Sequence, residues 1–169
     1  MKKLIFPIVA IYLAVILENS FLNYFLIHGR SLDLVLITFL FIFLLRHWSN
    51  NQLLIIGIWT GFMLDVFRYP GFGIGLTAIL ILITLYQISR HWITSPKKIS
   101  GFILWFLIYN LVFYASIRLL GYFGSLVFHY PSIVSTVTSG GLGIQILFNG
   151  IIASLIFLSR QQSKKIFLK

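Results

Sequence analysis

The side chains in this sequence that could do acid–base or nucleophilic chemistry are few and scattered. There is no cysteine, which excludes disulfides, thiolate nucleophiles and cysteine-based metal sites. The three acids are Glu18, Asp33 and Asp65, and none of the four histidines has a ligand partner at metal-binding spacing. No acid and histidine converge on a serine such as Ser20 or Ser116. We therefore expect a protein that is not an enzyme and holds no metal or cofactor.

The composition is that of a protein dissolved in lipid. Hydrophobic residues make up 59% of the chain and charged residues 9%, against roughly 25% charged in an average soluble domain. The apolar residues come in long runs and do not alternate with polar ones. Although the net charge is +10, the basic residues stand singly or in pairs and form no basic face, which argues against nucleic-acid binding. We expect residues 1–169 to form a single integral membrane domain, with lipid as a partner and no nucleic acid.

Six apolar runs approach the length of about 20 residues that a helix needs to cross the hydrocarbon. An all-α bundle of transmembrane helices is expected, because only helices satisfy every backbone group within one segment. The first run follows Lys3 and is read as a retained span, since no cleavage site for a signal peptide follows it. The fifth is long enough to tilt, or to break at Gly121 and Gly124. The runs are Leu4–Ile27, Leu32–Leu45, Leu53–Phe67, Phe72–Ile88, Ile99–Phe128 and Leu142–Leu158, the last with an alternative start between Ser132 and Ser139.

The positions of lysine and arginine predict the orientation of these spans. If the first span starts inside, ten of the thirteen basic residues lie on the cytoplasmic side, and only Arg30, Arg68 and Arg118 lie on the other. An excess of this kind marks the cytoplasmic side of a membrane protein. With an even number of spans, both termini are then cytoplasmic, and the expected location is the inner membrane as a multi-pass protein. The ten are Lys2, Lys3, Arg46, Arg90, Lys97, Lys98, Arg160, Lys164, Lys165 and Lys169.

The three acids and the three remaining arginines all fall in the outer half of the predicted bundle. Ionisable groups inside a bilayer are costly and usually pair. Counted at about 1.5 Å per residue, Glu18 in the first span and Arg118 in the fifth lie at similar depths. We therefore hypothesise an ion pair between Glu18 and Arg118. The alternative is that Arg118 extends outward to water and that Glu18 is neutral or hydrated.

A row of small residues marks the third span as a packing surface. Gly57, Gly61 and Asp65 are spaced four apart and so share one stripe of the helix. Small residues at this spacing let a second helix approach closely. Asp65 then lies at the outer end of the stripe, where it could pair with Arg68 or with a partner protein. The alternative is that Asp65 only caps the turn before Pro70.

The turn after this stripe is rich in glycine. The segment Gly71-Phe72-Gly73-Ile74-Gly75-Leu76-Thr77-Ala78 opens the fourth span. A glycine-rich turn at a helix start can cradle an anion, but this one lacks the Lys-Ser/Thr of a nucleotide loop and follows a helix, where such loops follow a strand. A structural turn is the favoured interpretation, with Gly73 and Gly75 as packing candidates.

The core Gly61-Phe62-Met63-Leu64-Asp65-Val66-Phe67, followed by Gly71–Ala78, resembles a Gly-x-x-x-Asp, turn and Leu/Ile-Gly-Leu element of the MreD family. MreD is the small multi-pass subunit of the bacterial rod-shape system. The resemblance implies a scaffold without enzymatic activity that binds MreC, a bitopic membrane protein. Through MreC, such a scaffold couples the MreB cytoskeleton to the enzymes of peptidoglycan synthesis.

A second resemblance leads to a different function. The chain is also similar in size and charge to the substrate-binding subunits of energy-coupling-factor transporters, whose first helix carries an Ala-x-x-x-Ala element that Ala10 and Ala14 match. This resemblance implies a pocket for a vitamin or a metal, lined by the outer-half residues Glu18, Asp65, Arg68 and Arg118. The scaffold is favoured, because two alanines at this spacing are common in membrane helices.

Overall fold

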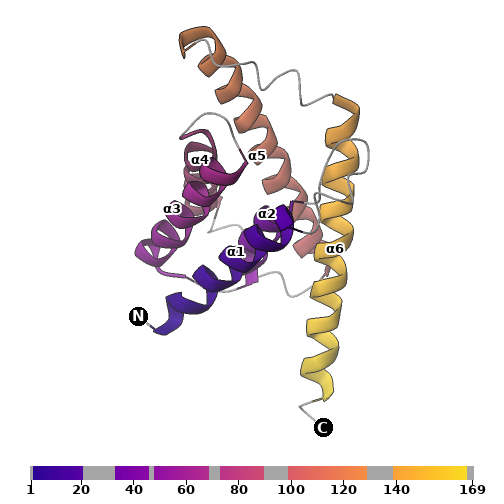
Figure 1. The fold of residues 1–169 in the computed structure, drawn as a ribbon. Coiled ribbons are helices and arrows are strands. Elements are labelled where there is room, and N and C mark those ends of the chain that lie inside the picture. Colours follow the sequence, from indigo (N-terminus) through magenta and orange to yellow (C-terminus); the bar gives the residue numbers. More distant parts are fainter. Residues whose placement is uncertain are drawn as a thin grey trace.

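The computed structural model describes residues 2–20, 33–45, 48–68, 73–89, 99–128 and 139–166. Within these residues the fold is all-α, with six helices and no strand (Figure 1). The predicted runs are confirmed as helices, although the first run beyond Ser20 lies outside the described residues. The fifth helix is unbroken through Gly121 and Gly124. The sixth begins at Ser139, within the alternative start predicted for it, and continues beyond its predicted end to Ile166. The helices are α1 (Lys2–Ser20), α2 (Leu34–Leu45), α3 (Asn50–Phe67), α4 (Ile74–Ser89), α5 (Ile99–Phe128) and α6 (Ser139–Ile166).

The short helix α2 is the centre of the bundle. It packs against α1, α3, α5 and α6, and Leu36 and Leu40 are fully buried. Its sequence is apolar on nearly every side, which is typical of a helix in the interior. With 12 residues it rises only about 18 Å. In its first turn, Val35 and Leu36 are buried.

Aromatic rings fill the space between α2, α5 and α6. The rings of Phe43 and Tyr109 meet edge to face at 5.7 Å, and those of Phe102 and Phe157 stack at 4.6 Å. Offset and edge-to-face contacts of this kind contribute about 0.5–1.5 kcal/mol each beyond the burial of area. The stack places Phe157 beside the beginning of α5, so α6 runs antiparallel to α5.

The start of α3 is fixed by local hydrogen bonds. The Ser49 hydroxyl accepts the backbone N–H of Gln52 at 3.4 Å, and the Gln52 side chain accepts the Ser49 N–H at 3.2 Å. This reciprocal pair satisfies two donors that a helix start leaves open. The indole N–H of Trp48 donates to the carbonyl of Ile42 at 2.9 Å, which ties the connection back onto α2. From there α3 and α4 form a hairpin, the most extensive helix pair of the bundle.

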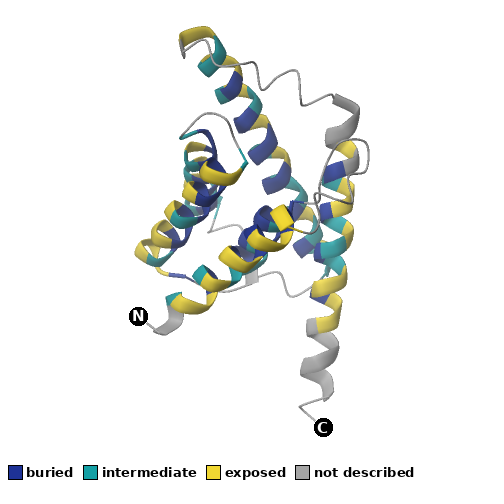
Figure 2. Cartoon of the chain, in the orientation of Figure 1, coloured by how far each residue is buried: buried dark blue, intermediate teal, exposed yellow. Residues whose placement is uncertain are grey.

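The outward faces of the bundle are apolar. Large hydrophobic side chains are exposed on α1, α3, α5 and α6, whereas all three acids are at most 6% exposed (Figure 2). Of the described helices, the stretch Ile99–Val127 in α5 is long and apolar enough to cross a membrane by length and composition. The apolar stretches Leu4–Ser20, Leu34–Leu44, Ile74–Ser89 and Gln145–Ser159 are shorter. Helix length alone thus supports a crossing for α5.

Candidate functional site

The carboxylate of Asp65 caps the start of α4. Its Oδ1 accepts the N–H of Gly75 at 2.5 Å, and its Oδ2 accepts the N–H groups of Gly73 at 2.9 Å and Leu76 at 3.2 Å. These donors are among those that a helix leaves unsatisfied at its N-terminus. The side chain is 5% exposed, so water has little access to replace it. An acid near the end of one helix therefore holds the beginning of the next.

Two glycines on the same stripe of α3 let α4 come this close. A Cβ atom on Gly61 would lie 2.5 Å from Cα of Leu76, a backbone atom that cannot move aside. A Cβ atom on Gly57 would collide with Cδ1 of Ile83, which is the flexible end of a side chain. The predicted packing role of the stripe Gly57-Gly61-Asp65 thus agrees with the geometry, and its partner is α4. We call this contact the α3–α4 seam.

The glycines of the turn serve the seam in two different ways. Gly73 has φ of +97°, a backbone conformation that side chains other than glycine rarely adopt. A Cβ on Gly75 would lie 2.9 Å from both Oδ1 of Asp65 and Cβ of Leu64, so this position requires close approach. Both residues shape the turn so that its N–H groups reach the Asp65 carboxylate. Residues 69–72 of the turn lie outside the described residues.

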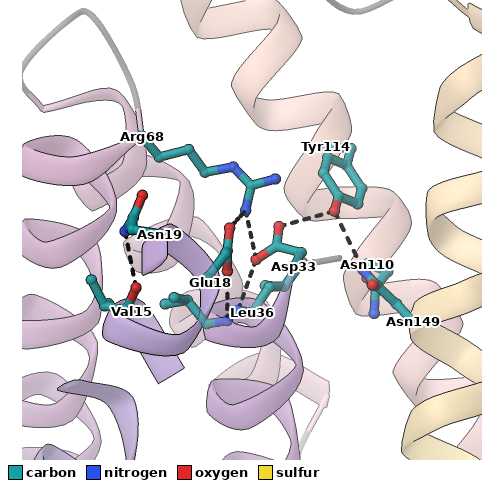
Figure 3. A network of polar contacts seen from close by, with 10 residues as sticks. Val15, Glu18, Asn19, Asp33, Leu36, Arg68, Asn110, Tyr114 and Asn149 are labelled. Atoms are coloured by element: carbon teal, nitrogen blue, oxygen red, sulfur yellow. Dashed lines mark hydrogen bonds and ion pairs between the residues drawn. The ribbon is translucent and has the colours of Figure 1, made fainter. Parts of the chain in front are cut away.

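A second group of charges holds the start of α2 (Figure 3). One guanidinium nitrogen of Arg68, Nη1, lies 2.8 Å from Oε1 of Glu18 and 2.8 Å from Oδ1 of Asp33. The other Glu18 oxygen accepts the N–H of Val35 at 3.2 Å, and Asp33 accepts the N–H of Leu36 at 3.0 Å. Arg68 therefore bridges two carboxylates that both cap α2. We call Glu18, Asp33 and Arg68 the charged triad.

A chain of neutral polar side chains continues from the triad into the bundle. The Tyr114 hydroxyl of α5 donates to Oδ2 of Asp33 at 3.0 Å, and the Asn149 amide of α6 donates to Tyr114 at 3.3 Å. The same amide donates to Oδ1 of Asn110 at 3.2 Å. Tyr114 is 7% exposed and both asparagines are fully buried. These side chains link α2, α5 and α6, and Figure 3 shows them in one row beside the triad.

Glu18, Asp33 and Arg68 lie together at one end of the bundle, as the sequence predicted, but their contacts differ from the predicted ones. The structure pairs Glu18 with Arg68 at 2.8 Å, so the hypothesis of a Glu18–Arg118 pair is corrected. The physical reason is that α2 lies between α1 and α5, which do not pack together within the described residues. The ion pairs shown for Arg68 are with Glu18 and Asp33, whereas both oxygens of Asp65 accept backbone N–H groups of α4.

Three contributors were missed in the sequence: Tyr114, Asn110 and Asn149. Asp33 was placed among the acids of the outer half, but its contacts were not predicted. The two asparagines carried a usable signal, because an amide in the middle of an apolar run is expensive in lipid unless it is hydrogen-bonded. Asp33 carried another, because aspartate directly before an apolar run is a common helix cap. The four histidines lie outside the described residues.

The carboxylates of the three acids are all used in contacts within the bundle, which limits the reactions that they could catalyse. All six carboxylate oxygens of the three acids accept a hydrogen bond or an ion pair from the described residues. A cavity of about 230 Å³ lies beside the triad between α1, α2 and α3, with Glu18, Asn19 and Arg68 on its polar side and Val15, Met63 and Phe67 among its apolar lining. The arrangement can brace helices and can admit a small guest.

Comparisons of this chain with protein-family models, with curated proteins and with solved structures gave no match.

The seam predicts a graded response to substitution of its glycines. Gly61→Ala should lower the free energy of unfolding in detergent by about 1–3 kcal/mol, the usual range for an overpacked interior, because the obstacle is the α4 backbone. Gly57→Ala should cost less, because the Ile83 side chain can turn away. Gly143→Ala is the control, since a Cβ atom there meets nothing within 4 Å. Equal melting of the Gly61 and Gly143 variants would contradict the seam.

The capping geometry predicts how Asp65 variants behave. Asp65→Ala leaves the N–H groups of Gly73, Gly75 and Leu76 without their acceptor. Because one buried N–H without an acceptor costs about 1–3 kcal/mol, we expect a loss of at least about that size. Asp65→Asn keeps one acceptor oxygen and should lose less. Thermal melting of the purified chain measures both. Ser125→Ala is the control, because among the described residues that exposed hydroxyl donates to the Tyr122 carbonyl of its own helix. If both Asp65 variants melt like the parent, the carboxylate is not a stabilising cap and its role lies with a partner.

Proposed function

We propose that this chain is a multi-pass inner-membrane protein that crosses the bilayer six times, with both termini in the cytoplasm. The surface chemistry supports this proposal more than helix length does. Large apolar side chains such as Phe6, Leu111 and Leu155 are at least 60% exposed, while Asn110 and Asn149 are fully buried. A water-soluble bundle would reverse this pattern. The Asn149 amide donates to Asn110 inside the bundle, since polar groups surrounded by lipid must find partners.

Within that membrane setting, we infer that the protein is a scaffold subunit of the bacterial cell-shape complex and not an enzyme. The observation that carries this proposal is the α3–α4 seam. The residues on which the resemblance to MreD rests, Gly61, Asp65, Gly73 and Gly75, meet in one contact. A motif that fixes two helices against each other suits a scaffold, because a scaffold must keep one fixed surface for an MreC-like bitopic partner to bind.

The engagement of the acids also supports a scaffold. Glu18 and Asp33 share one guanidinium, and Asp65 is occupied by the start of α4. None of these carboxylates presents an unengaged oxygen that could serve as a general base, the usual requirement for acid–base catalysis. Under this proposal, loss of the protein changes cell shape through the machinery that it assembles.

A transport subunit is the second candidate, and the cavity beside the charged triad favours it. Its volume of about 230 Å³ is below the roughly 300–1,000 Å³ typical of ligand pockets, so it suits only a small guest. Glu18 and Arg68 line this cavity, as the alternative interpretation expected, whereas Asp65 faces α4 and does not line it. The scaffold remains our proposal.

One purification distinguishes the two functions. The full chain, tagged and cross-linked in a rod-shaped bacterium that depends on it, should capture a bitopic wall-synthesis protein, and Gly61→Leu should reduce that capture at least about tenfold, since the altered hairpin no longer packs. Gly143→Ala should capture normally. Mass spectrometry of the same sample supplies the opposing outcome. A small molecule retained at one per chain, with no bitopic protein captured, would refute the scaffold and support transport.

A further inference from the structure

The three acids of the chain lie at one end of the bundle. Glu18 is near the last turn of α1, and Asp33 begins α2 beside it. Asp65 is in the last turn of α3, three residues from Arg68, the third member of the triad. Contacts within the triad and the seam therefore place every acid of the chain at one end. The opposite end of the bundle has none.

Basic residues occupy that opposite end. Lys2 and Lys3 begin α1, and Arg160, Lys164 and Lys165 lie in the last turns of α6. Glu18 is 16 residues along α1 from Lys2, a rise of about 24 Å, so the lysines are far from the triad. The stack of Phe157 on Phe102 places α6 beside the beginning of α5, and α6 continues beyond it to Ile166 (Figure 1).

The length of α6 fixes where its basic turns emerge. Its 28 residues rise about 42 Å, against a hydrocarbon thickness of about 30 Å. Ile166 lies nine residues past Phe157, which is about 13 Å along the axis. In Figure 1 the last turns of α6 extend past the other helices. Because the backbone is helical up to Ile166, these residues continue a helix of the bundle.

We propose that this end of the bundle binds the headgroups of anionic phospholipids, through Lys2 and Lys3 of α1 and Arg160, Lys164 and Lys165 of α6. The inference rests on the membrane placement proposed above and not on the scaffold role. Basic residues close to an anionic surface each strengthen association about fivefold. The field of that surface decays over about 8 Å at physiological salt. The roughly 12 Å by which α6 exceeds the hydrocarbon thickness is of the same order. Lipid headgroups are therefore the anions nearest to them.

The test uses the full chain, purified in mild detergent and mixed with equal amounts of phosphatidylglycerol and phosphatidylcholine. Native mass spectrometry gives the ratio of the two lipids retained. The parent chain should retain phosphatidylglycerol preferentially, and Lys164→Gln with Lys165→Gln should lower that preference about tenfold or more, as expected from the loss of two residues. Added salt at about 0.5 M should also weaken the preference of the parent chain for phosphatidylglycerol, because salt screens the charges.

Two controls separate this proposal from a general effect of charge or folding. Gln161→Ala with Gln162→Ala changes uncharged residues on the same turns and should leave the preference unchanged. Arg118→Gln removes a charge one turn past Tyr114, at the acidic end, and should also leave it unchanged. Equal retention of the two lipids by the parent chain would overturn the proposal, as would an unchanged preference in the double lysine variant. Binding of an acidic protein by the same residues, without lipid preference, would likewise refute it.

Discussion

A buried helix start must find acceptors for its backbone N–H groups where water cannot supply them, and this requirement organises the structure. The first N–H groups of a helix have no partner within the helix, and leaving one unsatisfied in an apolar interior costs about 1–3 kcal/mol. In this chain α2 and α4 begin inside the bundle. Each beginning receives carboxylates, which are the strongest acceptors available and also match the positive end of the helix dipole.

In both helical hairpins, α1–α2 and α3–α4, an acid near the end of the first helix caps the start of the second. Glu18, near the end of α1, accepts an N–H of α2, and Asp65, near the end of α3, accepts N–H groups of α4. The carboxylates differ in how their charge is balanced. Glu18 and Asp33 share the single positive charge of Arg68, whereas Asp65 accepts three N–H groups at one helix terminus. Arg68 leaves the end of α3 to reach the start of α2, and so it joins the two hairpins.

The neutral network extends this joint to the long helices. Asp33 accepts from Tyr114 of α5, which in turn accepts from Asn149 of α6. In the membrane setting proposed above, buried hydrogen bonds between helices are worth only about 0.6–2 kcal/mol each, so they specify the arrangement more than they drive assembly. Driving force comes instead from close packing, which the glycines of the seam and the aromatic contacts around α2 provide.

The positions of the helices could be predicted from the sequence, because long runs of apolar residues are typical of helices surrounded by lipid. The fifth helix was predicted at the bounds observed, Ile99–Phe128, and the spacing of Gly57, Gly61 and Asp65 indicated a packing stripe. Rotation and neighbours were not predictable in the same way. A helix as uniformly apolar as α2 has no polar face to orient it, and depth along a span does not say which helix lies across from it. For this reason Glu18 was matched with Arg118 by depth, although α2 intervenes.

Hydrogen exchange of the backbone amides in a lipid bicelle tests the central role of the acids most directly. The account predicts that the amides of Val35, Leu36, Gly75 and Leu76 exchange at least about a hundredfold more slowly than those of Asn50 and Asn51, which are at the exposed start of α3. In Asp65→Asn, protection should fall at Gly75 and Leu76 and persist at Val35 and Leu36. Equally fast exchange at all three helix starts would contradict the account, because it would show that the carboxylates do not hold the amides that they face.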